Sequence, residues 1–120
     1  MVSRGISFGP TAGVADTKTT IGSAYTFASQ GRIKKIRWNG DQATADIGLQ
    51  GIVILDFKRL TGPFEFAVGM SGAKVTAGET SVPTSEIDVD IPYENGEVVT
   101  VSYKGTETTA DATVSLTVLE

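Results

Sequence analysis

Residues 87–119 read IDVDIPYENGEVVTVSYKGTETTADATVSLTVL, and this stretch decides the fold. Apolar and polar residues alternate in three runs within it, at 87–91, 99–103 and 112–118. Successive side chains of a β-strand point to opposite faces, so strict alternation indicates a strand with one apolar and one polar face. The C-terminal third therefore predicts three half-buried strands.

The turn after Tyr93 limits how the first two of these strands could pair. A two-residue turn at Asn95-Gly96 would place Ile91 opposite Thr100, which sets an apolar face against a polar one. A three-residue loop over 94–96 instead places Ile91 opposite Val99, and Gly96 supplies the left-handed residue that such a loop needs. We predict the three-residue loop if the two strands pair. In a jelly roll the chain would instead cross to the other sheet here.

Six further strands and one long loop are predicted upstream. The strands are a short one at Ile6 and Phe8, then 19–27, 32–38, 43–49, 52–57 and 64–70, and the polar segment 71–85 is a loop. Ile33 and Ile36 fall on opposite faces unless Lys34-Lys35 forms a bulge. The run 52–57 is apolar except for Asp56, which is typical of a strand that is covered on both faces.

The composition of the 120 residues agrees with an all-β chain. The sequence has 12 Val, 9 Ile and 16 Thr against 5 Leu, and β-branched side chains favour pleated strands over helices. No linker or repeat divides the chain. We predict a single domain over residues 1–120, an antiparallel β-sandwich of about eight strands. Jelly-roll topology is preferred and an immunoglobulin-like order is second, because the Cys–Trp–Cys signature of immunoglobulin domains is absent.

Several kinds of chemistry are excluded by the residue inventory. The sequence has 0 Cys and 0 His, which removes disulfides, thiolate or imidazole zinc sites, thiol nucleophiles and His-based triads. Most acidic residues take the polar positions of strands or lie in turns. The carboxylates of Glu86, Asp88 and Asp90 would be spread about 6–7 Å apart along a strand, too far for one cation. We predict no enzyme, no catalytic residues, no cofactor and no metal.

Charge is distributed unevenly along the chain. Residues 1–60 carry a net charge of +4 and residues 61–120 a net charge of −8. A basic cluster at 32–37 and an acidic stripe at 86–90 stand out, and they would either be solvated faces or meet across neighbouring strands or subunits. The candidate interface residues are Arg32, Lys34, Lys35, Arg37, Glu86, Asp88 and Asp90. Nucleic-acid binding is not predicted, because the protein is acidic and lacks a recognition motif.

Four aromatic residues allow an alternative function. Trp38, Tyr25, Tyr93 and Tyr103 could form stacking platforms for a sugar, although each takes a position where the pattern calls for a core residue. This alternative is a carbohydrate- or receptor-binding module. Its loop at 71–85 would contribute only polar groups, namely Lys74, Thr76, Glu79 and Thr80.

The run IDVDIPYENGEVVTVSYKGTETTADATVSLTVLE at 87–120 resembles the closing strands of small virion β-sandwich proteins of bacterial and archaeal viruses. Those proteins are capsid, decoration or spike-base subunits, often with a single jelly roll. The resemblance implies a building block without catalytic residues, which forms a trimer or higher homo-oligomer and packs against other virion proteins.

Two further observations bear on assembly and location. The uncharged segment 112–119 must lie either in the centre of its sheet or against another chain, because exposed edges are normally protected. No apolar run is long enough for a membrane span, and the N-terminus lacks the apolar segment of a signal peptide. We therefore expect no signal peptide, and a virion location with assembly in the host cytoplasm.

Overall fold

The computed structural model describes residues 2–14, 16–42, 50–71, 84–105 and 109–120. It contains nine strands: β1 (Ser3–Gly13), β2 (Thr19–Thr20), β3 (Tyr25–Thr26), β4 (Gly31–Gln42), β5 (Gln50–Arg59), β6 (Gly62–Ser71), β7 (Thr84–Tyr93), β8 (Val98–Gly105) and β9 (Thr109–Leu119). The described residues form no helix that is long and apolar enough to cross a membrane.

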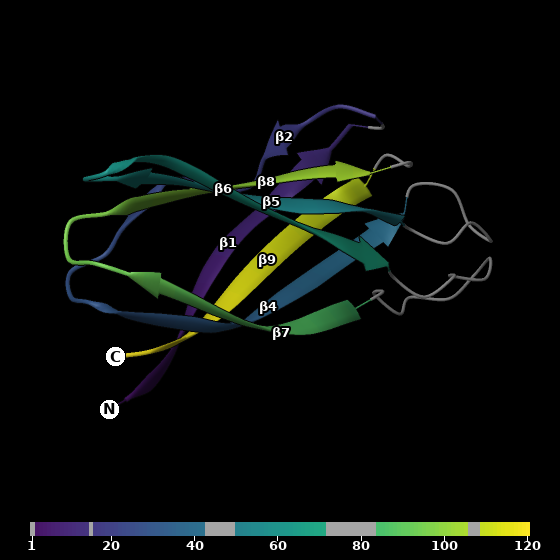
Figure 1. The fold of residues 1–120 in the computed structure, drawn as a ribbon. Coiled ribbons are helices and arrows are strands. Elements are labelled where there is room, and N and C mark those ends of the chain that lie inside the picture. The colour runs from purple at the N-terminus through teal and green to yellow at the C-terminus, as the bar shows by residue number, and fades with distance from the viewer. Residues whose placement is uncertain (1, 15, 43–49, 72–83, 106–108) are drawn as a thin grey trace.

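The strands form two antiparallel sheets whose order is that of a jelly roll. The first sheet has the order β1-β9-β4-β7, and the second has β2-β8-β5-β6 with β3 also paired to β8 (Figure 1). The pairs are nested, because β5 pairs with β6, β4 with β7, β2 and β3 with β8, and β1 with β9. A long hairpin that folds over into two sheets gives this nesting. The predicted all-β jelly-roll sandwich is confirmed.

The core lies between the sheets and consists of the inward-facing residues of strands from both of them. Its buried residues are Ile6, Phe8, Ile21, Phe27, Ile33, Ile36, Trp38, Val53, Leu55, Phe57, Ile91, Tyr93, Val99, Val101, Tyr103, Ala112, Val114, Leu116 and Val118. β9 contributes four of them, and it lies between β1 and β4 in the middle of the first sheet. A central position explains why segment 112–119 carries no charge.

The predicted bulge in β4 is confirmed. Its register with both β7 and β9 shifts between Ile33 and Lys35. Because of the shift, the side chains of Ile33 and Ile36 both lie in the core with no exposed surface. The extra residue at the bulge leaves Lys34 and Lys35 on the outer side of the sheet.

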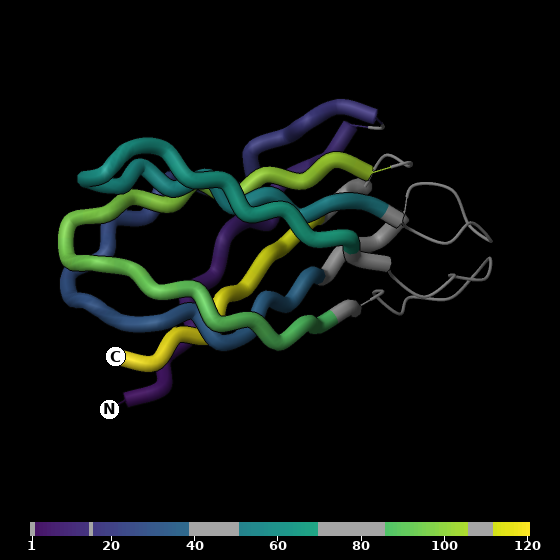
Figure 2. The backbone as a smooth tube through the Cα atoms, in the orientation of Figure 1, coloured from purple at the N-terminus to yellow at the C-terminus, as the bar shows by residue number. Residues whose placement is uncertain are grey.

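The segments 87–91 and 99–103 do not pair, because the two strands belong to different sheets, so the hairpin register does not apply and the crossing expected for a jelly roll is confirmed. β7 pairs with β4, where Ile91 lies opposite Ile33, and β8 pairs with β5, where Val99 lies opposite Phe57. The chain crosses from one sheet to the other at this turn (Figure 2). Gly96 nevertheless has the expected positive φ, 88°. In this jelly roll the turn connects the two sheets instead of joining two paired strands of one sheet.

Two strand predictions need correction. The expected single strand at 19–27 is divided into β2 and β3, with Gly22 at a φ of 69° between them. A Cβ at Gly22 would lie 2.7 Å from the backbone nitrogen of Gly9, so the chain turns where another strand passes closely. β5 is not covered on both faces, because Ile52 is 43% exposed. The predicted strand at 43–49, and residues 72–83 of the predicted loop, lie outside the described residues.

Candidate functional site

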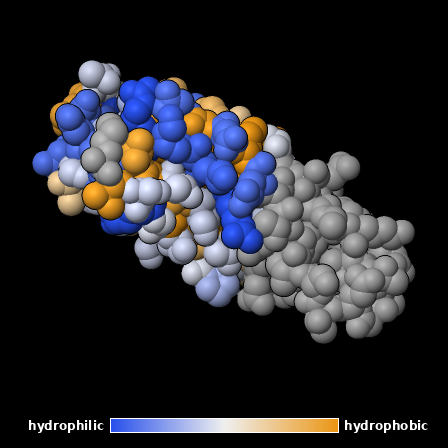
Figure 3. Space-filling view, turned by 90° about the horizontal axis from the view of Figure 1, so that it is seen from below, coloured by the Kyte–Doolittle hydropathy of each residue, from blue (hydrophilic) through white to orange (hydrophobic). Residues whose placement is uncertain are grey.

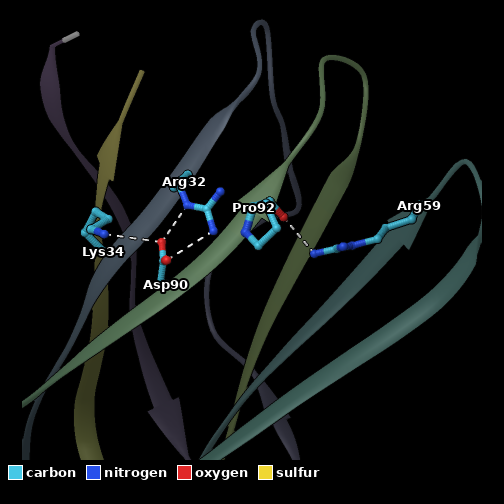
Figure 4. A network of polar contacts seen from close by, with 5 residues as sticks. All are labelled: Arg32, Lys34, Arg59, Asp90 and Pro92. Atoms are coloured by element: carbon cyan, nitrogen blue, oxygen red, sulfur yellow. Dashed lines mark hydrogen bonds and ion pairs between the residues drawn. The ribbon is translucent and has the colours of Figure 1, made fainter.

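The basic cluster and the acidic stripe meet within one chain. β4 and β7 are antiparallel neighbours, which places the basic residues of one strand beside the acidic residues of the other on the outer face of the first sheet. The Nε of Arg32 lies 2.6 Å from Oδ1 of Asp90, and Nη2 lies 3.1 Å from Oδ2, so the guanidinium binds the carboxylate through two bonds (Figure 4). Such forked pairs are the strongest surface ion pairs.

The other five charged residues extend this contact along the two strands. Lys34 Nζ lies 3.3 Å from Asp90, Lys35 Nζ lies 3.7 Å from Glu86 and 4.0 Å from Asp88, and Arg37 Nε lies 3.7 Å from Glu86. We call these seven residues the charge ladder: Arg32, Lys34, Lys35, Arg37, Glu86, Asp88 and Asp90. All are well exposed, and a surface ion pair contributes only about 0–1 kcal/mol to stability.

All seven predicted interface residues belong to the charge ladder. Its charges have partners inside the chain, so the uneven charge along the sequence is explained without a second subunit. The hydrogen bonds from Arg32 and then Lys34 lower the pKa of Asp90 to about 2, which keeps this carboxylate ionised. A role of the ladder between subunits stays a prediction.

Next to the ladder the sandwich ends in a cleft of about 450 Å³, which we call the end cleft. It is lined by Gln30, Gly31, Arg32, Pro92, Tyr93, Glu94, Leu119 and Glu120. A smaller cleft of about 230 Å³ adjoins it and shares Pro92, Tyr93 and Glu94. The concave surface therefore spans the corner where the chain crosses between the sheets.

Arg59 joins the two sheets at this corner. Its Nη2 donates to the carbonyl oxygen of Pro92 at 2.8 Å (Figure 4). Its guanidinium lies 4.9 Å from the ring centre of Phe57 and 4.5 Å from that of Phe64. A cation over two aromatic faces is held in place, and it closes the smaller cleft on the side of β5.

Glu120 lies at the inner wall of the end cleft and accepts hydrogen bonds from three other residues. Its Oε1 accepts hydrogen bonds from the Tyr93 hydroxyl at 2.9 Å and from Arg4 at 2.5 Å, and its Oε2 accepts one from Ser29 at 2.9 Å. The bonds from Arg4, Ser29 and Tyr93 lower the pKa of Glu120. Burial is the main reason that the pKa of Tyr93 is raised. This cluster joins residues that lie far apart in the sequence, and no pattern in the sequence indicates it.

The aromatic residues do not form the platforms that sugar stacking would need. Trp38, Tyr93 and Tyr103 are at most 2% exposed. Tyr25 is half-buried, with the guanidinium of Arg4 5.8 Å from its ring centre. The sequence pattern, which calls for core residues at these positions, is therefore confirmed for the three buried rings.

The carboxylates of the ladder and of Glu120 are held by cations or hydroxyl donors, and the described residues include no group of three acidic side chains placed to hold a metal ion. On the underside of Figure 1, hydrophilic residues cover much of the described surface with hydrophobic patches between them (Figure 3). No family model and no curated protein matches the sequence.

Proposed function

We propose that this chain is a structural subunit of a virus particle, as a capsid, decoration or spike-base protein that self-associates. The observation that carries the proposal is the strand order, since jelly rolls with these nested pairs are the architecture of many capsid domains. The segment that resembles virion proteins, 87–120, covers most of β7 and all of β8 and β9. In this proposal the protein forms a trimer or higher homo-oligomer and packs against other virion proteins, in particles assembled in the host cytoplasm.

A fold alone does not determine a function, so the proposal depends on self-association. The most direct test is the mass of the purified chain by light scattering, with negative-stain imaging of the same sample. We expect a defined oligomer or closed particles. A monomer at every accessible concentration, with no particles in the images, would contradict the self-associating subunit.

The end cleft favours a second candidate, a carbohydrate- or receptor-binding module. Its volume of about 450 Å³ lies within the range of about 300–1,000 Å³ that is usual for small-molecule sites. Gln30, Arg32 and Glu94 supply polar groups around it. The four polar loop residues first considered for such a site, Lys74, Thr76, Glu79 and Thr80, lie outside the described residues. Binding on a glycan array that is lost in Gln30→Ala would favour this candidate over the first.

A further inference from the structure

The two sheets have four outer strands, and three of them carry features that block pairing with another chain. β7 carries the acidic half of the charge ladder and has Pro92 near its end. β1 contains Pro10 and loses its regular register after Phe8. β2 and β3 are two residues long each. Charges, prolines, irregular register and short length are the usual means of protecting a sheet edge.

β6 lacks this protection. It runs beside β5 over its full length, from Gln50 opposite Ser71 to Arg59 opposite Gly62, without a register shift. Glu65 is its one charged residue, and its proline, Pro63, stands at the start of the strand where proline is tolerated. Within the described ranges β5 is its one strand partner. Alternate N–H and C=O groups of β6 therefore point away from the sheet.

The side chains of β6 are also apolar at this edge. Phe64 is 39% exposed, and Phe66 and Val68 lie partly buried at the rim of the core. Leu60, in the turn that leads into β6, is 86% exposed. A long, regular and apolar edge of this kind favours the addition of another strand.

We propose that β6 pairs antiparallel with β6 of a second copy of the chain, around a two-fold axis at Phe66. This inference rests on the proposed function and names one contact through which the subunits associate; it joins two copies, so a larger assembly uses a second kind of contact as well. The axis places Phe66 opposite Phe66, and Phe64 opposite Val68, of the two copies. All these side chains then lie on the inner face, because residues that are directly opposite share a face. The two sheets continue into one.

Charge disfavours one of the neighbouring registers that keep the faces matched. On the outer face, Glu65 of each copy lies opposite Ala67 of the other. An axis at Glu65 would place the two carboxylates opposite each other, which is unfavourable. A shift of the pairing by one residue would set the inner phenylalanines against the outer face. The strand is therefore complementary to itself, which is the requirement for a symmetric two-fold contact.

A charge at Ala67 tests the contact without touching the core, since this side chain is exposed on the outer face. Ala67→Glu creates two like-charge contacts with Glu65, and we expect the association measured by sedimentation to weaken by about tenfold or more. Ala67→Lys, which changes the same position but opposes Glu65 with a cation, should keep or strengthen the association. Ser7→Glu puts the same charge on β1 and should have no effect. Equal association of all three variants would overturn the contact.

Cysteine cross-linking tests the register, because the chain has 0 Cys of its own. We expect a mixture of Glu65→Cys and Ala67→Cys chains to form a disulfide-linked mixed dimer, since directly opposite Cα atoms lie within the range of disulfides. A mixture of Ser7→Cys and Ala67→Cys chains should link only at the background level. Linking of Ala67→Cys chains with each other would overturn the axis at Phe66.

These results separate the edge contact from the proposed function. If the unchanged chain assembles, Ala67→Glu assembles equally well and no mixed disulfide forms, then the β6 contact is wrong while self-association stands. If the unchanged chain stays a monomer and no mixed disulfide forms, both proposals fail. Circular dichroism of each variant establishes that it is folded before its mass is compared.

Discussion

The two ends of the sandwich are built around the same arrangement, a buried tyrosine stacked on a second aromatic ring. Tyr93 stacks on Phe27 with ring centres 3.7 Å apart, and Tyr103 stacks on Trp38 at 5.0 Å. Gly31 lies opposite Tyr93 on β4, and Trp38 lies seven residues further, about 23 Å along the strand. Both tyrosines are 2% exposed.

The ends differ in what the buried hydroxyl contacts. The Tyr93 hydroxyl donates to Glu120 at 2.9 Å, whereas the Tyr103 hydroxyl and the Trp38 Nε1 have no hydrogen-bond partner in the described part of the chain. A buried polar group without a partner costs about 1–3 kcal/mol. One end is therefore stabilised by packing and a charged hydrogen bond, and the other by packing that outweighs an unpaired hydroxyl. Equal burial does not mean equal stabilisation.

Removal of one aromatic ring should lower stability by a similar amount at both ends, and this tests the stacked ring pair that the two ends share. We expect Phe27→Ala and Trp38→Ala each to lower the free energy of unfolding by about 3–5 kcal/mol, because each leaves a cavity in the core. Urea unfolding measures both values. A loss below about 1 kcal/mol for either would mean that its ring is not packed in the core as described.

Removal of the hydroxyl alone should separate the ends. Tyr93→Phe loses a hydrogen bond to a carboxylate, and we expect a loss of about 1.5–3 kcal/mol. Tyr103→Phe loses no hydrogen bond and removes an unpaired polar group, so stability should stay the same or increase. The matched pair is measured in the same urea experiment. A clear loss in Tyr103→Phe would show that this hydroxyl has a partner.

Alkaline pH should reveal Tyr103 through its ionisation. Burial raises its pKa from 10.0 to about 12. The stability that comes from keeping the hydroxyl neutral is fully present below pH 10 and is lost as the pH rises towards 12, with about 1 kcal/mol lost near the middle of that window. The free energy of unfolding, measured across this pH range, should fall less steeply in Tyr103→Phe than in the unchanged chain. Parallel curves would contradict the shifted pKa.

Low pH should destabilise the Tyr93 end by protonating Glu120. We expect this loss of stability to be the smallest of the series, because the carboxylate is partly solvated. Its pKa is lowered from 4.5, chiefly by the hydrogen bond from Arg4. The stability from the ionised form is therefore present above pH 4.5 and is lost as the pH falls below it. We expect Glu120→Gln to flatten the acid side of the stability curve, measured by thermal unfolding at several pH values. An unchanged slope would show that Glu120 does not contribute.

Local patterns predicted the parts of the fold that depend on neighbouring residues in the sequence. The alternation in 87–91, 99–103 and 112–118 correctly placed the apolar residues of β7, β8 and β9 on the inner face, although Ser102, at a polar position of β8, is also buried. The bulge beside Ile33 followed from the same rule, since two isoleucines could not otherwise share a face. In each case the alternation of side chains between the two faces of a strand was enough to predict the feature.

Pairing over long distances in the sequence could not be predicted in this way. The hairpin register of 87–103 satisfied every local rule, yet Ile91 pairs with Ile33 because the sheets of a jelly roll recruit distant strands. A contact of the two charged stripes between neighbouring strands was one of the stated expectations, but the sequence did not indicate which residues pair. The Glu120 cluster was missed because its members lie at positions 4, 29, 93 and 120.

The nested pairing of the strands also sets the order in which the chain can fold. β5 and β6 are joined by two residues, Leu60 and Thr61, whereas Arg4 and Glu120 are 116 positions apart. Each inner pair that forms shortens the loop that the next pair must close, which lowers its entropic cost. Folding should therefore proceed outward from the β5–β6 turn over milliseconds to seconds, the range of all-β sandwiches. Substitutions at that turn would slow folding, and those at β1 or β9 would mainly speed unfolding.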